Sequence, residues 1–218
     1  MILFSDWGCP FAHRIEAWVA HLGVELEHRR KGLGDPFPEL EACGGGHRIP
    51  SLLCEDLLLF ESAVIVDYLI ERSERPVPEA PSPEGRAVER LARLTFDAEL
   101  VPRLFASDAE LDAEGRVVGA PLGDRSFEVL ERLELCCVGS RPVVSRLSLH
   151  LAPMWLRFRW WRPHDRLTRL LLEDARWRAL GEWLEAAAAL PCVRVTSPTA
   201  EMQRDVLRRG RALGVLPA

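Results

Sequence analysis

Cys9 is the residue whose type and position point most directly to chemistry. It follows a short apolar run and precedes Pro10, which suits the first turn of a helix because its missing N–H costs nothing there. Unpaired N–H groups and the dipole at a helix N-terminus lower the pKa of a thiol, so Cys9 is a candidate nucleophile. The alternative is a small buried apolar residue, the usual state of a free cysteine. The helix itself is predicted from apolar residues at spacings of three and four, namely Ile15, Trp18, Val19 and Leu22.

Two further patterns accompany Cys9 in the first third of the chain. Ile49-Pro50 opens a short apolar strand that a tight turn at 55–56 joins to a second one, and Glu61-Ser62 opens another helix. Ser62 is a good N-cap candidate for that helix. Each pattern alone has an ordinary structural explanation, since most X-Pro bonds are trans and most such serines only cap a helix. Their order along one small domain makes a common site the stronger interpretation.

The chain divides into two domains of different class. Residues 1–76 read as strand, helix, strand, short helix, two strands and helix, which predicts an α+β domain with helices packed on a mixed sheet. A proline-rich stretch without periodicity contains the linker, placed at 77–84. Residues 85–218 carry only helical stripes, which predicts an all-α helical bundle.

Composition excludes several classes of function. The chain has 218 residues and a net charge of -5, which disfavours a general nucleic-acid binder. Its six cysteines follow neither a zinc spacing nor a secreted disulfide framework, so we expect no metal and a reducing, cytoplasmic setting. No apolar run approaches the ~18 residues of a membrane span, and no signal peptide is apparent, so we expect no membrane association.

The motifs together resemble the glutathione transferase superfamily. Cys9-Pro10-Phe11-Ala12 resembles the catalytic turn of its thioredoxin-like domain, and Ile49-Pro50 resembles the segment with the cis-proline. Glu61-Ser62 resembles the glutathione-binding turn between strand and helix. The turn is most similar to cysteine-type members, the omega class and related bacterial proteins. The resemblance implies a thioredoxin-like domain, an all-α C-terminal domain and a homodimer.

The resemblance also implies a reaction. Glutathione is the expected co-substrate, held by Phe11, Ile49, Pro50, Glu61 and Ser62. Ser62 at a helix N-terminus binds the γ-glutamyl carboxylate, and Glu61 accepts from the ammonium group. Cys9 then attacks a glutathione mixed disulfide or similar adduct, and a second glutathione resolves the enzyme-bound disulfide. Ala12 leaves the turn without a resolving cysteine, which favours thiol transfer over conjugation.

Several alternatives stay open. A conjugating or bond-cleaving transferase on a small electrophile, or a non-enzymatic binding or regulatory protein, can use the same fold. The basic residue for the glycyl carboxylate is Lys31, Arg30 or His47. Trp155 and Phe158 are candidates for the acceptor site, although helical spacing also fits core packing. The usual acid of a helix capping box is replaced in Ser145-Arg146-Leu147-Ser148, which predicts a cap weaker by ~1 kcal/mol.

Overall fold

The computed structural model describes residues 1–106, 110–116, 118–139, 142–214 and 216. Two compact units emerge, the first built from Met1–Val77 with Pro191–Leu213 and the second built on Pro78–Leu190. The units differ from the predicted domains at the C-terminal end, because Pro191–Leu213 groups with the first unit. A helix also begins at Pro83, inside the stretch predicted as linker. Contiguous sequence therefore does not define either unit completely.

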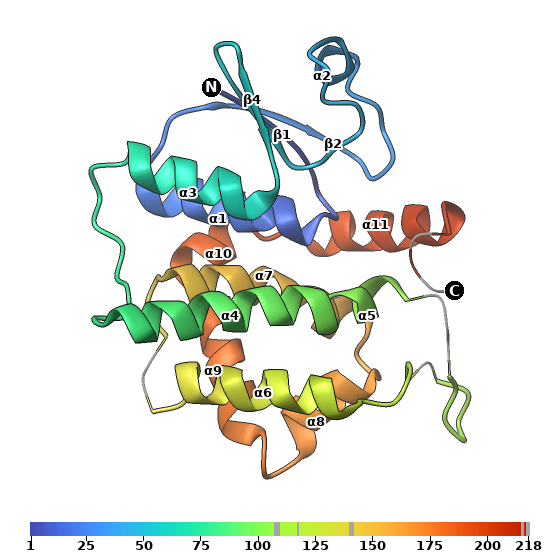
Figure 1. The fold of residues 1–218 in the computed structure, drawn as a ribbon. Coiled ribbons are helices and arrows are strands. Elements are labelled where there is room, and N and C mark those ends of the chain that lie inside the picture. Colours follow the sequence, from blue (N-terminus) through green and yellow to red (C-terminus); the bar gives the residue numbers. More distant parts are fainter. Residues whose placement is uncertain (107–109, 117, 140–141, 215, 217–218) are drawn as a thin grey trace. The chain divides into compact units, whose positions relative to one another are not determined.

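The first unit holds a four-stranded sheet with the order β2-β1-β3-β4. β1 (Ile2–Asp6) pairs in parallel with β2 (Glu27–Lys31) and antiparallel with β3 (Ser51–Cys54). β4 (Leu57–Phe60) completes the sheet as the partner of β3. The helices of this part of the unit are α1 (Pro10–Leu22), α2 (Pro38–Ala42) and α3 (Ser62–Arg72). This mixed sheet with helices confirms the predicted fold class of the N-terminal domain (Figure 1).

Local sequence explains both ends of α1. Cys9 is its N-cap in an extended conformation and Pro10 is its first residue. The helix ends at Gly23, whose φ of 69° is a left-handed conformation that glycine adopts without a steric penalty. On its apolar face Ile15 and Trp18 are buried, while Val19 and Leu22 are partly exposed. Burial of a side chain as large as Ile15 or Trp18 contributes about 1.5–3 kcal/mol.

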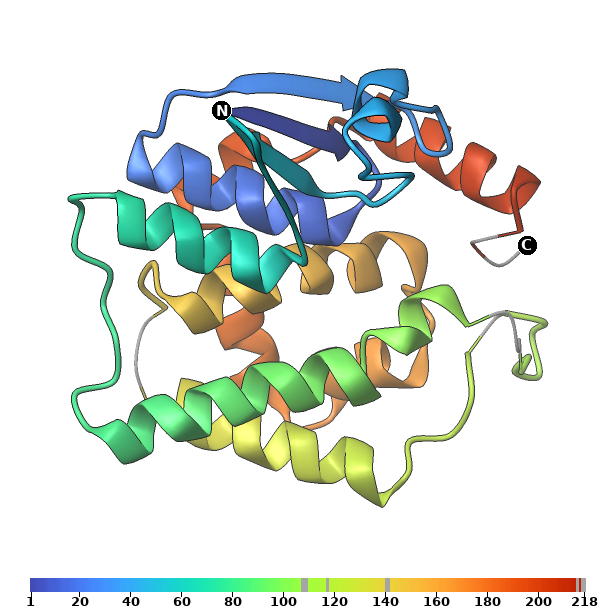
Figure 2. The same ribbon diagram turned by 45° about the horizontal axis from the view of Figure 1, so that its top comes forward.

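Two helices from the far end of the chain complete the first unit. They are α10 (Pro191–Thr196) and α11 (Ala200–Ala212), drawn in red beside α1 in Figures 1 and 2. His13 on α1 joins α10 through its Nε2, which lies 3.2 Å from the Val193 carbonyl oxygen and 3.1 Å from Thr196 Oγ1. His13 is 2% exposed because α10 covers it.

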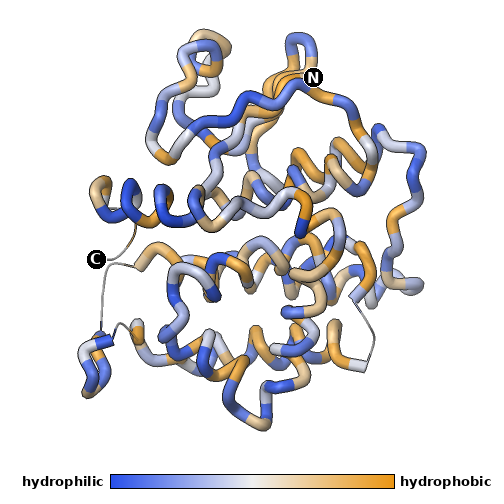
Figure 3. Tube along the Cα trace, turned by 180° about the vertical axis from the view of Figure 1, so that it is seen from behind, coloured by the Kyte–Doolittle hydropathy of each residue, from blue (hydrophilic) through white to orange (hydrophobic). Residues whose placement is uncertain are grey.

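The second unit is helical throughout its assigned elements. Its amphipathic helices bury leucine and aromatic side chains, and Figure 3 shows hydrophobic and hydrophilic residues alternating within single helices. Among them, α7 contains Pro153 in its interior. The elements are α4 (Pro83–Glu99), α5 (Pro102–Phe105), α6 (Asp124–Cys137), α7 (Arg146–Trp161), α8 (Arg166–Glu173) and α9 (Arg178–Ala188).

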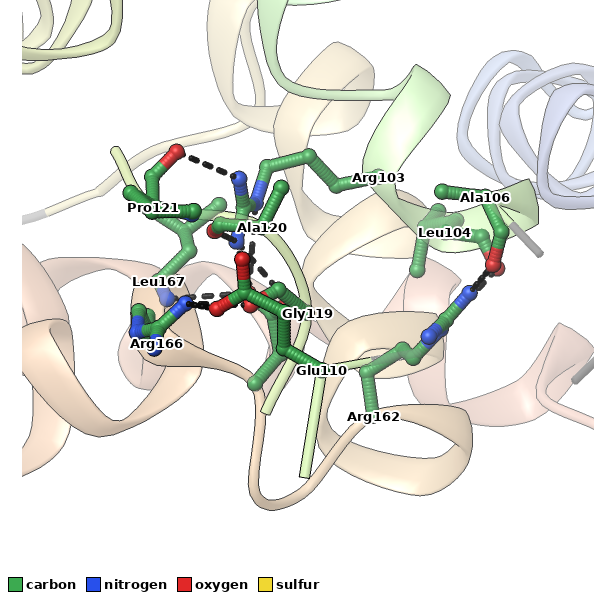
Figure 4. A network of polar contacts seen from close by, with 11 residues as sticks. Arg103, Leu104, Ala106, Glu110, Gly119, Ala120, Pro121, Arg162, Arg166 and Leu167 are labelled. Carbon is green, nitrogen blue, oxygen red and sulfur yellow. Dashed lines mark hydrogen bonds and ion pairs between the residues drawn. The ribbon is translucent and has the colours of Figure 1, made fainter. Parts of the chain in front are cut away.

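A network of arginines ties the α5–α6 segment to the start of α8 (Figure 4). Asp165, 1% exposed, caps α8 by accepting from the Leu167 N–H at 2.9 Å, and Arg103 pairs with its carboxylate at 3.0 Å. Arg103 and Arg166 also donate to the carbonyls of Ala120 and Gly119. The buried carboxylate of Asp165 and the carbonyl of the buried Gly119 are satisfied in this way, as the interior of a protein requires.

The capping box of α7 forms without an acid. The Ser148 N–H donates to Ser145 Oγ at 3.1 Å, and the Ser145 N–H donates to Ser148 Oγ at 2.9 Å. The Ser148 hydroxyl, having accepted that bond, donates to the Val143 carbonyl at 2.6 Å. A carboxylate could not make this last bond, so the serine adds a contact that the usual acid lacks.

Candidate active site

The turn between β1 and α1 is shaped by Asp6. Its Oδ1 accepts from the backbone N–H groups of Gly8 and Cys9, both at 2.7 Å. This places the half-buried Cys9 at the N-cap of α1, where its Sγ accepts from the Ala12 N–H at 3.4 Å. A donor directed at the sulfur and the positive end of the helix dipole both favour the thiolate form. Cys9 therefore lies at the helix N-terminus where the sequence predicted it.

The Ile49-Pro50 segment lies against the same sulfur. Cys9 Sγ is 3.7 Å from the carbonyl oxygen of Ile49, and the Ile49–Pro50 peptide bond is cis. Pro50 is buried, while Ile49 is partly exposed. The segment is held there because β3 begins at Ser51, which pairs with Phe4 of β1. Two motifs far apart in sequence therefore meet at one point.

The Glu61-Ser62 motif forms the start of α3, with the roles of its residues shifted by one. The sequence favoured Ser62 as the N-cap, but Glu61 is the N-cap and Ser62 is the first helical residue. Glu61 has a φ of 69° and a ψ of 112°, a strained conformation for a residue that is not glycine. Its side chain is exposed and Ser62 is 7% exposed. Strain of this kind is concentrated at ligand-binding sites, where surrounding structure enforces it.

Arg14 links the thiol helix to the Glu61-Ser62 turn. Its guanidinium donates to Ser62 Oγ at 3.4 Å and lies 5.1 Å from the centre of the Phe11 ring. Arg14 is 2% exposed, so it is a structural cation inside the unit rather than a free surface charge. The predicted site residues Phe11 and Ser62 are thus connected through a side chain whose partners the sequence did not identify.

The three residues predicted to bind the glycyl carboxylate either contact other groups or are exposed to solvent. The Lys31 ammonium donates to the Pro36 carbonyl and lies 4.7 Å from the Phe37 ring centre. Arg30 pairs with Glu16 at 3.0 Å and covers the Trp7 ring. His47 has an 81% exposed side chain.

Arg48 is a candidate cation that the sequence reasoning missed. Its guanidinium lies 4.5 Å from the centre of the Phe60 ring. The residue directly precedes Ile49, and Phe60 directly precedes Glu61. This adjacency to two motifs was the available signal. Arg48 therefore joins Lys31, Arg30 and His47 as a candidate partner for a carboxylate at this site.

Trp155 and Phe158, the candidates for the acceptor site, are buried in the second unit. Trp155 is 2% exposed and its indole N–H donates to Glu185 Oε1 at 2.9 Å. Phe158 is 1% exposed. These environments favour core packing, the alternative that the helical spacing had left open. Neither residue offers an open face to a substrate in this structure.

The described part of the chain holds neither a cluster of metal-binding side chains nor a membrane-spanning helix. Within it, no three His, Cys, Asp or Glu side chains gather as a metal ion would need. The helices described there are also too short or too polar to cross a bilayer. All six cysteines are free thiols.

Comparison with known proteins defines the class of the fold. Residues 3–78 match the family model described as glutathione S-transferase, N-terminal domain. The crystal structure of glutathione transferase Omega 1C from Trametes versicolor superposes with a TM-score of 0.73 and 18% identity, covering 100% of this chain and 98% of that one. A tau-class glutathione S-transferase from mango superposes with a TM-score of 0.67 and 19% identity, covering 97% of each chain. Residues 3–78 therefore resemble a glutathione S-transferase N-terminal domain, and the chain has the fold of the glutathione transferases.

Curated relatives resemble only part of the chain. A stringent starvation protein A homolog from Haemophilus influenzae is 30% identical over 117 residues, which are 52% of this chain and 54% of the relative. A probable glutathione S-transferase from Oryza sativa subsp. indica is 31% identical over 147 residues, 58% of this chain and 64% of the relative. The chain thus spans about half to two thirds of the length of these relatives.

Proposed function

We propose that this protein is a cysteine-type glutathione transferase that catalyses glutathione-dependent thiol transfer through Cys9. The observation that carries the proposal is the 3.7 Å approach of Cys9 Sγ to the Ile49 carbonyl oxygen. The backbone at Ile49 lies where an extended peptide can pair with it, so the sulfur of a bound glutathione is brought to the thiol. The match of residues 3–78 to the transferase N-terminal domain supports the same ligand.

The two ends of glutathione have suitable partners in this proposal. Ser62, at the first turn of the helix α3, receives the γ-glutamyl carboxylate at its N–H and hydroxyl. The exposed Glu61 carboxylate accepts from the ammonium group. Arg14 orients the Ser62 hydroxyl by donating a hydrogen bond to its oxygen. In this proposal Phe11, whose ring contacts Arg14, flanks the glutathione peptide together with Ile49 and Pro50.

The proposed reaction proceeds by two thiol–disulfide exchanges. The Cys9 thiolate attacks the glutathione sulfur of a mixed disulfide, the acceptor thiolate leaves, and Cys9–S–S–glutathione forms. A second glutathione thiolate attacks that glutathione sulfur, which releases glutathione disulfide and regenerates the Cys9 thiolate. Ala12 stands where a resolving cysteine would be, so both steps depend on free glutathione. The fold family is the reason to expect a homodimer. The free cysteines suit a reducing, cytoplasmic setting.

Reduction of a small glutathione mixed disulfide tests this proposal. We expect the substitution Cys9→Ser to lower the rate by about 100-fold or more, because a hydroxyl is a far weaker nucleophile than a thiolate. Cys43→Ser is the matched control, since Cys43 is an exposed free thiol of the same unit. Equal rates for the wild type and Cys9→Ser would contradict the proposal.

A binding role without turnover is the second candidate. It is favoured by the relatives that are named stringent starvation protein A homolog rather than transferase. Calorimetric titration with glutathione separates the two. Thiol transfer predicts a dissociation constant below about 1 mM with a dependence on Glu61 and Ser62. A binding protein that has lost the site predicts no measurable heat in wild type or variants.

A further inference from the structure

The C-terminal helix α11 lies against the thiol turn of its own unit. Val206 on this helix is 1% exposed, and a Cβ built on Gly8 would be 2.8 Å from Val206 Cγ1. Gly8 directly precedes Cys9, and its N–H is one of the two held by Asp6. A glycine is therefore needed at this position for α11 to approach, and the isopropyl group of Val206 closes the outer side of the turn.

The same helix also covers the loop that follows β2. Arg209 donates to Asp35 Oδ1 at 2.9 Å, and its guanidinium carbon would be 2.8 Å from a Cβ at Gly32. Leu213, directly after α11, would lie 2.7 Å from a Cβ at Gly34. Gly8, Gly32 and Gly34 thus each leave room for one side chain from this end of the chain. The side chains of this C-terminal segment therefore pack closely against the backbone at these three glycines.

The two covered loops belong to one edge of the sheet. β1 and β2 run parallel, so the turn after β1 and the loop after β2 lie at the same edge. They are joined directly, because the Trp7 N–H donates to the Lys31 carbonyl at 3.4 Å. Figures 1 and 2 show α11 beside the beginning of α1 at this edge.

We propose that α11 positions the Cys9 thiol, with Val206 and Arg209 as the positioning residues. This inference rests on the proposed function in taking Cys9 as the reacting group. Val206 fixes Gly8, and Gly8 with Asp6 fixes the orientation in which Cys9 Sγ receives the Ala12 N–H. Arg209 holds the Gly32–Asp35 loop against the other side of the turn. The reactivity of a thiol in the first unit therefore depends on residues nearly two hundred positions along the chain.

The pH dependence of Cys9 alkylation by iodoacetamide, followed by mass spectrometry of the Cys9 peptide, tests this inference. We expect Gly8→Ala to lower the rate at neutral pH by about threefold to tenfold, because the new methyl displaces the turn and weakens thiolate stabilisation. Val206→Ala removes the two methyl groups near the new Cβ and leaves Asp6 Oδ1 at 3.3 Å, so Gly8→Ala should have less than about a twofold effect in that background. An equal effect of Gly8→Ala in both backgrounds would overturn the coupling.

A second pair of variants keeps the test valid if Gly8→Ala fails to fold. Arg209→Ala and Arg208→Ala remove neighbouring arginines of one helix, but only Arg209 contacts the Gly32–Asp35 loop, while Arg208 is exposed and pairs with Asp205. We expect the midpoint of the alkylation profile to rise for Arg209→Ala and to stay at the wild-type value for Arg208→Ala. Identical profiles for the two variants would contradict the role of Arg209.

The alkylation assay is independent of the transfer assay. A wild type without thiol transfer, whose alkylation nevertheless depends on Val206 and Arg209, would contradict the proposed function alone. A wild type that transfers thiols, with unchanged alkylation in the Gly8, Val206 and Arg209 variants, would contradict the positioning role alone.

Discussion

The sheet edge of the first unit that carries Cys9 (the thiol edge) and the helical core of the second unit differ in backbone regularity and in burial. At the edge, Gly8 makes room for another helix, Glu61 holds a strained conformation, and Cys9 stays partly exposed. In the core of the second unit, Trp155 and Phe158 are almost completely buried. The difference shows that the irregular backbone of this chain lies beside a half-buried thiol, whereas these two aromatic side chains lie in a closed core.

The polar groups of the two regions also differ in purpose. In the second unit, Asp165 and Arg103 satisfy one another and nearby carbonyls. In the first unit, Asp6 and Ala12 direct their hydrogen bonds at the thiol turn and at the sulfur itself. Substitutions in the core should therefore change stability without changing the reactivity of the thiol. Substitutions at the thiol edge should change the reactivity of the thiol or the binding of glutathione, with little loss of stability.

The largest expected effect is in the core. Phe158→Ala should reduce the free energy of unfolding by about 3–5 kcal/mol, because it leaves a cavity in a packed region. Urea unfolding measures the loss, and the Michaelis constant for the disulfide acceptor should stay within about twofold of wild type. A raised Michaelis constant with unchanged stability would instead restore Phe158 as an acceptor-site residue.

The next effect concerns His28, a residue of the strand β2. Burial, and then the charge of Arg30, lower the pKa of His28 to about 4 from 6.5, although Glu16 lies 3.5 Å away. Glu16 already accepts from Ser5 and pairs with Arg30, so the carboxylate does not offset the burial. Because the folded-state pKa is the lower one, His28 favours the folded state above pH 6.5, and this contribution is lost as the pH falls towards 4.

The substitution His28→Asn should remove this pH dependence. Between about pH 6.5 and 4, wild-type stability should fall by about 2 kcal/mol more than that of the variant, which is less than the full pKa shift implies because solvent screens this partly exposed imidazole. His47→Asn, at an exposed histidine of the same unit, is the control. Parallel stability curves for wild type and His28→Asn, measured by urea unfolding across this range, would contradict the assignment.

A third prediction sets stability against binding at the edge. Glu61→Gly relieves the positive φ at the N-cap of α3, so stability should stay constant or rise by up to about 1 kcal/mol. Loss of the carboxylate should weaken glutathione binding by about tenfold in calorimetric titration. Glu71→Gly, at an exposed position inside α3, is the control that should destabilise without weakening binding. Unchanged affinity in Glu61→Gly would remove Glu61 from the site.

The smallest effect is expected at the α7 cap. Ser148→Ala should reduce the free energy of unfolding by about 1 kcal/mol, because the Ser145 N–H loses its acceptor and the Val143 carbonyl loses its donor. Ser145→Ala should cost a similar amount, and the double variant should cost less than the sum. Additive losses in thermal unfolding would show that the two serines act independently.

Much of the thiol site could be predicted because its signals are local. The periodicity after Pro10, the two short strands with Ile49-Pro50 before them, and the Glu61-Ser62 helix start each occupy a few consecutive residues. Their elements appear in the structure at Pro10–Leu22, Ser51–Cys54 and Ser62–Arg72. The sequence predicted the N-cap of α3 at Ser62, one residue too late. The N-cap is Glu61, whose positive φ is rare for a glutamate and could not be predicted from the residue type.

The sequence by itself determined that a thiol opens a helix after a strand, because proline, apolar spacing and glycine act over one or two turns of chain. Only the tertiary structure decided what surrounds that thiol. Arg14 reaching Ser62, α10 covering His13 and α11 closing over Gly8 depend on contacts between distant segments. Such contacts leave no periodic pattern in the sequence, since they follow from how whole elements pack rather than from how each one forms.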